Sequence, residues 1–170
     1  MNSVIATDIV DKQLSEVRRK RWEEVFSKQE NAVTPLLTQD QPDRVATMVI
    51  EHLVQASDVA HTMQHWHVFV KWNEKLFHEM YKAYLFGRAS EDPSKNWYQG
   101  ELNFFDFYVI PLAKKLVECG LFGPDADELV NYAEENRSEW ETRGKNLVDK
   151  FLESARKKFG GERKVAVHFS

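Results

Sequence analysis

Residues 102–110 read Leu-Asn-Phe-Phe-Asp-Phe-Tyr-Val-Ile, and the conformation of this stretch decides the fold class. By composition alone, a run so rich in aromatic and β-branched residues could form a buried strand. Two features favour a helix from 96 to 119 instead: the helical patterns on both sides, and the continuation Ala-Lys-Lys-Leu-Val at 113–117. Pro111 is then expected to bend this helix locally. The sequence therefore predicts an all-α protein.

Outward from this stretch, apolar residues recur at helical spacing in four further segments, and Gly and Pro fall mainly between them. The aromatic-rich segment is apolar on more than one face, which predicts burial on several sides. Gly144 marks a candidate break in the last segment. We expect a compact multi-helix bundle forming one domain over residues 1–159, followed by a polar tail, 160–170. The predicted helices span residues 4–28, 42–56, 65–86 and 125–158.

Composition limits the possible partners of the chain. Its 170 residues are 42% hydrophobic and 29% charged, as is usual for a globular protein with one core. The formal net charge is −4, with 23 Lys and Arg against 27 Asp and Glu. This mild acidity gives no reason to expect nucleic acid or an anionic membrane as a partner.

Cysteine usage and the apolar runs bear on the compartment. The single cysteine, Cys119, cannot form an internal disulfide and is expected to pack in the core. The first twenty residues carry charges inside a short apolar run, unlike a signal peptide, and no run is long enough to span a bilayer. An intracellular, cytoplasmic protein is expected.

One polar cluster could hold a metal ion. In a helix, Asp58, His61 and His65 would fall at i, i+3 and i+7 on one face, with His67 nearby. Carboxylate and imidazole ligands suit a divalent cation. The alternative, histidines that pair with backbone or water around an aromatic helix, is favoured by about two to one on the residues alone. A second cluster, which contains Gln99, Glu101 and Asp106, is typical of the wet side of a core helix.

Several motifs occur in an order and spacing that resemble the C-terminal half of the class I 3',5'-cyclic nucleotide phosphodiesterase catalytic domain. The likeness covers roughly residues 4–145, and each motif alone is weak. The motifs are Ala-Thr-Asp at 6–8, Asp43-Arg44, Ala-Ser-Asp-Val-Ala at 56–60, Trp72 fourteen residues after Asp58, Phe104-x-Asp106 with Pro111, and Asn136-Arg137 with Trp140.

The resemblance implies hydrolysis of cAMP or cGMP to 5'-nucleotides by two metal ions, zinc with magnesium or manganese, that activate water and neutralise phosphoryl charge. By position, Asp58 resembles a metal ligand, and His61 lies where many relatives place an asparagine near the purine. Leu76 and Phe104 match the two apolar residues that sandwich the base. Glu101 stands at the position of the purine-selective glutamine.

Two departures from the family pattern follow. An ionised Glu101 can only accept hydrogen bonds, whereas an amide also donates; Gln99, two residues earlier, could substitute if the helix register differs. No segment like HNxxHAxD or HDxxH precedes residue 4, so the other metal ligands and the general-acid histidine are expected upstream. The chain then resembles a phosphodiesterase cut in half, whose partners are a cyclic nucleotide and the missing N-terminal half.

Alone, such a chain is expected to be inactive and to bind metal weakly or not at all. Two other hypotheses remain open. One is a divergent, non-catalytic helical module that binds a nucleotide or a protein and self-associates through an apolar face. The other is a self-sufficient metal site formed by Asp58, His61 and His65.

Overall fold

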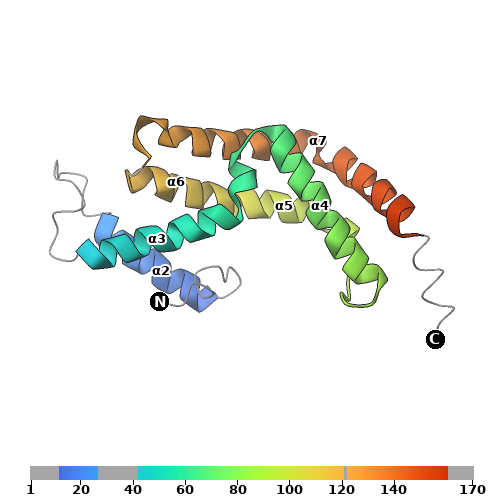
Figure 1. The fold of residues 1–170 in the computed structure, drawn as a ribbon, viewed down its shortest axis with the longest axis horizontal. Helices are drawn as coiled ribbons and strands as arrows, with labels where there is room; N and C mark the ends of the chain where they lie inside the picture. The colour runs from blue at the N-terminus through green and yellow to red at the C-terminus, as the bar shows by residue number, and fades with distance from the viewer. Residues whose placement is uncertain (1–11, 27–41, 121, 161–170) are drawn as a thin grey trace. The chain divides into compact units, whose positions relative to one another are not determined.

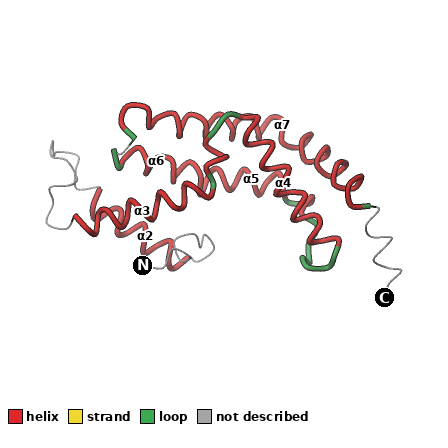
Figure 2. The backbone as a smooth tube through the Cα atoms, viewed as in Figure 1, coloured by secondary structure: helices red, strands yellow, loops and turns green. Residues whose placement is uncertain are grey.

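The computed structural model describes residues 12–26, 42–120 and 122–160, which form helices joined by turns (Figure 1). Within these ranges there is no strand, so the predicted all-α class is confirmed (Figure 2). No helix of the described part combines the length and apolar composition that a bilayer crossing requires. The α-helices are α2 (Lys12–Phe26), α3 (Pro42–Asp58), α4 (Trp66–Leu85), α5 (Trp97–Phe104), α6 (Ile110–Glu118) and α7 (Asp127–Phe159).

The helices fall into two compact units, Met1–Ala60 with Leu112–Asp127, and His61–Pro111 with Glu128–Ser170. The predicted helix over 42–56 is α3, and the one over 65–86 is α4. Of the predicted helix over 4–28, the structure describes the part Lys12–Phe26, which is α2. The Ala-Thr-Asp motif at 6–8 and the connection at 29–41 lie outside the described residues. The single-domain boundary at residue 159 stays a prediction.

The first unit is held together by Trp22 of α2. Its ring stacks on Phe26 at 3.9 Å and packs in one cluster with Val45 and Val49 of α3 and with Cys119. The indole Nε1–H donates to the Glu118 carboxylate at 2.9 Å, so its polar end is satisfied. Cys119 is buried and its thiol donates to a backbone carbonyl, which agrees with the predicted packing role.

The second unit has an aromatic core between α4 and α7. Phe69 makes edge contacts with Phe105 at 5.2 Å and with Trp140 at 5.6 Å between ring centroids, and all three side chains are fully buried. Such edge-to-face pairs add to the energy of burial. The aromatic segment is therefore buried on more than one side, as its sequence predicts.

A buried amide fixes the turn that precedes α4. The side chain of Asn136, in α7, donates to the backbone carbonyls of Thr62 at 2.9 Å and Gln64 at 2.7 Å. The turn thereby gains a hydrogen-bond donor for each of these two carbonyl groups. This is the structural role of the Asn136-Arg137 motif: Arg137 pairs with Asp106 at 2.9 Å.

The stretch 102–110 is helical, but it is not one regular α-helix. A π-helical turn, Phe105–Val109, separates α5 from α6 immediately before Pro111. Proline has no N–H, and its ring would collide with the carbonyl of residue 107 in a regular helix. The irregularity expected at Pro111 therefore occurs in the preceding turn.

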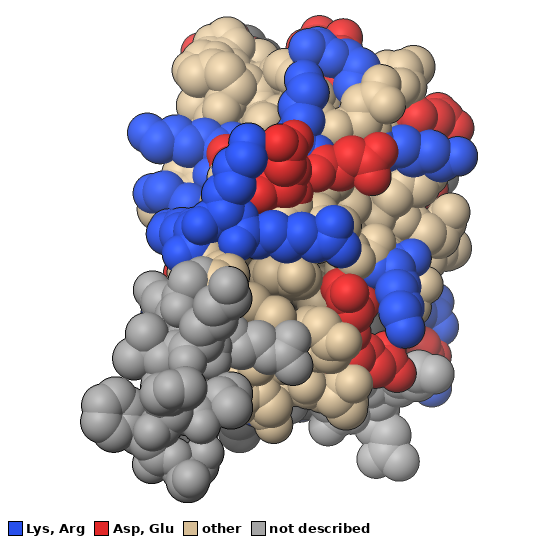
Figure 3. All heavy atoms as spheres, turned by 90° about the vertical axis from the view of Figure 1, so that its right-hand side faces the viewer, with Lys and Arg blue, Asp and Glu red and all other residues tan. Residues whose placement is uncertain are grey.

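The predicted break at Gly144 is wrong, because α7 runs without interruption from Asp127 to Phe159. Gly144 is buried, and a Cβ built on it would lie 2.8 Å from two ring atoms of Trp140. A glycine costs a helix only about 1 kcal/mol relative to alanine, and here it makes room for an indole. Figure 3 shows one face of the molecule, on which Lys and Arg side chains lie among Asp and Glu. Within α7, Lys157 pairs with Glu153 at 2.7 Å.

Two glycine substitutions test this packing. Gly144→Ala is expected to destabilise the protein by about 1–2 kcal/mol, since overpacking against the buried indole outweighs the gain in helix propensity. Gly100→Ala, in α5 with open space around its Cβ position, is expected to stabilise by up to about 1 kcal/mol. Urea unfolding followed by circular dichroism measures both. A stabilising Gly144→Ala would show that the indole is not held in this position.

Candidate functional site

The second unit contains a hydrogen-bonded chain of three side chains. Asn73, in α4, is buried, and its Oδ1 accepts from the indole Nε1–H of Trp97 at 3.0 Å. The side-chain amide of Asn73 also hydrogen-bonds the Glu101 carboxyl, and this bond lowers the pKa of Glu101. The bond therefore stabilises the carboxylate, which means that the amide N–H is the donor. The amide of Asn73 therefore links the Trp97 indole to the Glu101 carboxyl and fixes the position of the latter.

Glu101 is only partly buried by surface area, yet its carboxyl has lost most of its hydration. Burial raises the pKa of Glu101 from 4.5 to about 7, and the Asn73 hydrogen bond opposes this rise. Near neutral pH the carboxyl is therefore a mixture of acid and carboxylate.

Helices α4 and α5 run antiparallel, as two ring contacts show: Phe77 meets Trp97 at 5.1 Å and Phe69 meets Phe105 at 5.2 Å. Leu76 lies three residues after Asn73, and Phe104 lies three residues after Glu101, so each shares a helix face with its polar neighbour.

Because the two helices run in opposite directions, Leu76 and Phe104 lie on opposite sides of the Asn73–Glu101 pair along the helix axes. Leu76 is 46% exposed, and Phe104 is partly buried and stacks on Tyr108 at 5.3 Å. This arrangement, a carboxyl between two apolar side chains, suits a flat ligand with a polar edge.

His61 and Trp72 extend the apolar surface. Their ring centroids are 6.4 Å apart, and burial lowers the pKa of His61, which keeps this imidazole neutral at pH 7. Trp72 is half exposed, with the Lys75 ammonium 4.1 Å from its ring centroid. The structure therefore brings His61, Leu76, Glu101 and Phe104 into one unit, and their predicted role in binding substrate remains a prediction.

The remaining predicted site residues are placed as follows. Gln99 is exposed and its amide donates to Asn103 at 3.1 Å, so Glu101 and not Gln99 joins the Asn73 network. Asp58 is the last residue of α3, in the first unit, and is exposed. Asp106 is paired with Arg137.

The sequence also offers a metal site formed by Asp58, His61 and His65. Among residues 12–26, 42–120 and 122–160, no three His, Cys, Asp or Glu side chains are grouped so that they could hold a metal ion. The hypothesis of a self-sufficient site formed by Asp58, His61 and His65 has no support in these residues. His65 instead lies with its Nε2 3.3 Å from the Tyr132 hydroxyl.

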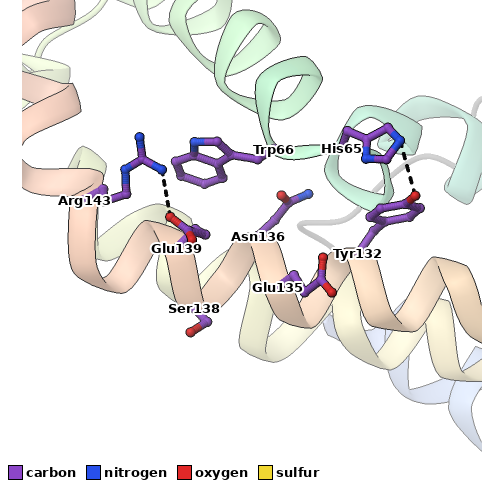
Figure 4. A pocket seen from close by; sticks show the side chains of 8 residues that line it. All are labelled: His65, Trp66, Tyr132, Glu135, Asn136, Ser138, Glu139 and Arg143. Carbon is purple, nitrogen blue, oxygen red and sulfur yellow. Dashed lines mark hydrogen bonds and ion pairs between the residues drawn. The ribbon is translucent and has the colours of Figure 1, made fainter.

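A pocket of about 360 Å³ lies elsewhere on the second unit, between the start of α4 and the middle of α7 (Figure 4). Arg143 donates to Glu139 at 2.9 Å and lies 5.4 Å from the Trp66 ring. No predicted substrate-binding residue lines this pocket. Its lining consists of His65, Trp66, Tyr132, Glu135, Asn136, Ser138, Glu139 and Arg143.

Sequence reasoning missed Asn73 and Trp97. A lone asparagine inside the aromatic segment, next to Trp72 and three residues before Leu76, was the available signal. A polar residue at a core position of a helix requires a hydrogen-bond partner. Candidates follow the loop 86–96, in the segment that contains Trp97 and Glu101.

A protein-family model matches most of the chain. The family model described as 3'5'-cyclic nucleotide phosphodiesterase matches residues 1–132 of the 170. No curated protein and no solved structure matches the chain.

The raised pKa of Glu101 predicts how stability varies with pH. From about pH 4.5 to 7 the unfolded chain releases a proton that the folded protein retains, so folding stability falls across this window and levels off above it. Glu101→Gln removes this titration and keeps an acceptor for Asn73. We expect the difference in free energy of unfolding, variant minus wild type, to grow by up to about 3 kcal/mol between pH 4.5 and 8.

Urea titrations at several pH values measure this difference. Glu79→Gln, which removes an exposed carboxylate of α4, is the matched control and should follow the wild-type curve. Parallel pH curves for wild type and Glu101→Gln would mean that the carboxyl is not desolvated.

Proposed function

Because the chain belongs to the 3',5'-cyclic nucleotide phosphodiesterase family, we propose that the protein hydrolyses cAMP or cGMP to the 5'-nucleotide. In this proposal the second unit of the chain supplies the purine-binding part of the pocket. Two observations support it: the Asn73 amide hydrogen-bonds the Glu101 carboxyl, and Leu76 and Phe104 follow these two residues by three positions on antiparallel helices.

A purine fits this arrangement by shape and by polarity. Its two faces are apolar and would lie against Leu76 and Phe104; stacking of a base on an aromatic side chain contributes about 1–3 kcal/mol. Its edge carries hydrogen-bond donors and acceptors, which require a polar partner in the same plane. The Glu101 carboxyl is that partner, because Asn73 and Trp97 restrict its orientation.

The family is metal-dependent in general, and the proposal assigns one ligand to this chain. The exposed carboxylate of Asp58 offers hard oxygen donors, which suit zinc, magnesium or manganese. Such ions lower the pKa of water and neutralise phosphoryl charge. One carboxylate does not form a site, and the described residues offer no grouped ligands, so the chain alone is proposed to bind metal weakly and to be inactive.

Two substitutions separate the metal role from the base-binding role. The chain is fused behind a metal-binding N-terminal half taken from another member of the family, and steady-state kinetics are measured on cAMP and cGMP. Asp58→Ala is expected to abolish turnover, because it removes a ligand needed for the chemical step. Phe104→Ala is expected mainly to raise KM, by about 5- to 150-fold, because stacking acts equally on substrate and transition state.

The control is Phe107→Ala, which truncates an aromatic side chain that is 80% exposed and should leave both constants near wild type. An Asp58→Ala fusion with near-normal kcat would remove Asp58 from the metal site. A fusion that binds cyclic nucleotide and never hydrolyses it would favour the non-catalytic binding module instead.

A further inference from the structure

We infer that Glu101 selects the purine through its own protonation state: the neutral acid accepts adenine or guanine, whereas the carboxylate accepts guanine and rejects adenine. This inference rests on the proposed function. Glu101 is an ionisable carboxylic acid, whereas the family resemblance places a glutamine, which does not titrate, at this position.

The Asn73 amide makes the two oxygens of Glu101 unequal. Because Trp97 donates to Oδ1 of Asn73 at 3.0 Å, the amide is oriented with its N–H toward Glu101. The carboxyl oxygen that accepts this N–H remains an acceptor in both protonation states. In the neutral acid the hydroxyl therefore sits on the other oxygen, and the group presents one acceptor and one donor, as an amide does.

The two bases respond differently to the loss of this proton. Adenine presents an amino donor next to the N1 acceptor, so it needs one acceptor and one donor from the protein. Guanine presents N1–H and the 2-amino group as adjacent donors, and also O6 as an acceptor beside N1–H. A carboxylate, which only accepts, pairs with both guanine donors but places a lone pair against adenine N1.

Among the described residues, no charged neighbour contributes to the pKa of Glu101, so its own protonation is the main change at this site as pH varies. Three charged side chains on α4 and α7 interact with other groups: Glu74 lies 3.8 Å from His78, Arg137 pairs with Asp106, and Lys145 lies over the Tyr98 ring. The influences on the Glu101 carboxyl are burial and the Asn73 amide, and neither is a charge.

His61 is the second titratable group on this surface, next to Trp72. Burial lowers the pKa of His61 from its ordinary value of 6.5 and raises that of Glu101 to about 7, so above pH 7 Glu101 is the group of this pair that mainly titrates. The cyclic phosphate and the bases of both nucleotides keep one charge state between about pH 5.5 and 8.5. A change of preference in the upper half of this range therefore reports on Glu101.

The test is the binding of cAMP and cGMP to the purified chain at about pH 5.5 and 8.5, measured by isothermal titration calorimetry. For the wild type we expect the Kd of cAMP to rise about tenfold or more with pH, as one mispaired hydrogen bond costs about that factor, while the Kd of cGMP changes less than about threefold. Glu101→Gln should bind both nucleotides with no pH dependence. His61→Asn can change the affinity for both nucleotides but should keep the pH-dependent preference between them, and the exposed control Glu79→Gln should behave as wild type.

A second measurement follows the carboxyl itself: the ¹³C signal of Glu101 in labelled protein, identified by its loss in Glu101→Gln, should titrate near pH 7. Wild type that binds both nucleotides with an unchanged preference overturns the inference and leaves the proposed function intact. A pH-dependent preference that persists in Glu101→Gln or disappears in His61→Asn also overturns it. If neither nucleotide binds wild type or Glu101→Gln at either pH, the proposed function of this chain falls as well.

Discussion

The side-chain amide of Asn73 is buried in the second unit and has to form hydrogen bonds at both ends, and the candidate site depends on this constraint. One end is satisfied by the Trp97 indole and the other by the Glu101 carboxyl. A buried amide without partners would cost about 1–3 kcal/mol, so its bonds position α5 against α4 as well as the carboxyl. Asn73 thus contributes both to the packing of the two helices and to the position of the carboxyl proposed to bind the ligand.

The fold was largely predictable, because helical periodicity and the positions of Gly and Pro are local signals. The helices over 42–58 and 66–85 begin and end within two residues of the predicted limits. Gly144 misled the prediction, since the sequence does not show that Trp140 needs the space beside it. The π-helical turn before Pro111 was predicted only as a bend, because its form depends on which carbonyls find partners.

The site was predictable only in part. The family resemblance identified Leu76, Glu101 and Phe104 by position, and the structure places them on two adjacent antiparallel helices. It could not identify Asn73 or Trp97, since their role arises from contacts across a loop of eleven residues, 86–96, between α4 and α5. The raised pKa of Glu101 was equally invisible, because it follows from burial, a property of the fold and not of the residue.

The central claim is that a purine lies between Leu76 and Phe104 with its edge at Glu101. A crystal structure of the chain soaked with 5'-AMP below about pH 6, where Glu101 is neutral, tests it most directly. The account predicts electron density for the adenine ring between these two apolar side chains, with its amino group and N1 facing the carboxyl. An adenine bound in the pocket of His65 and Tyr132, with the Glu101 surface empty, would contradict it.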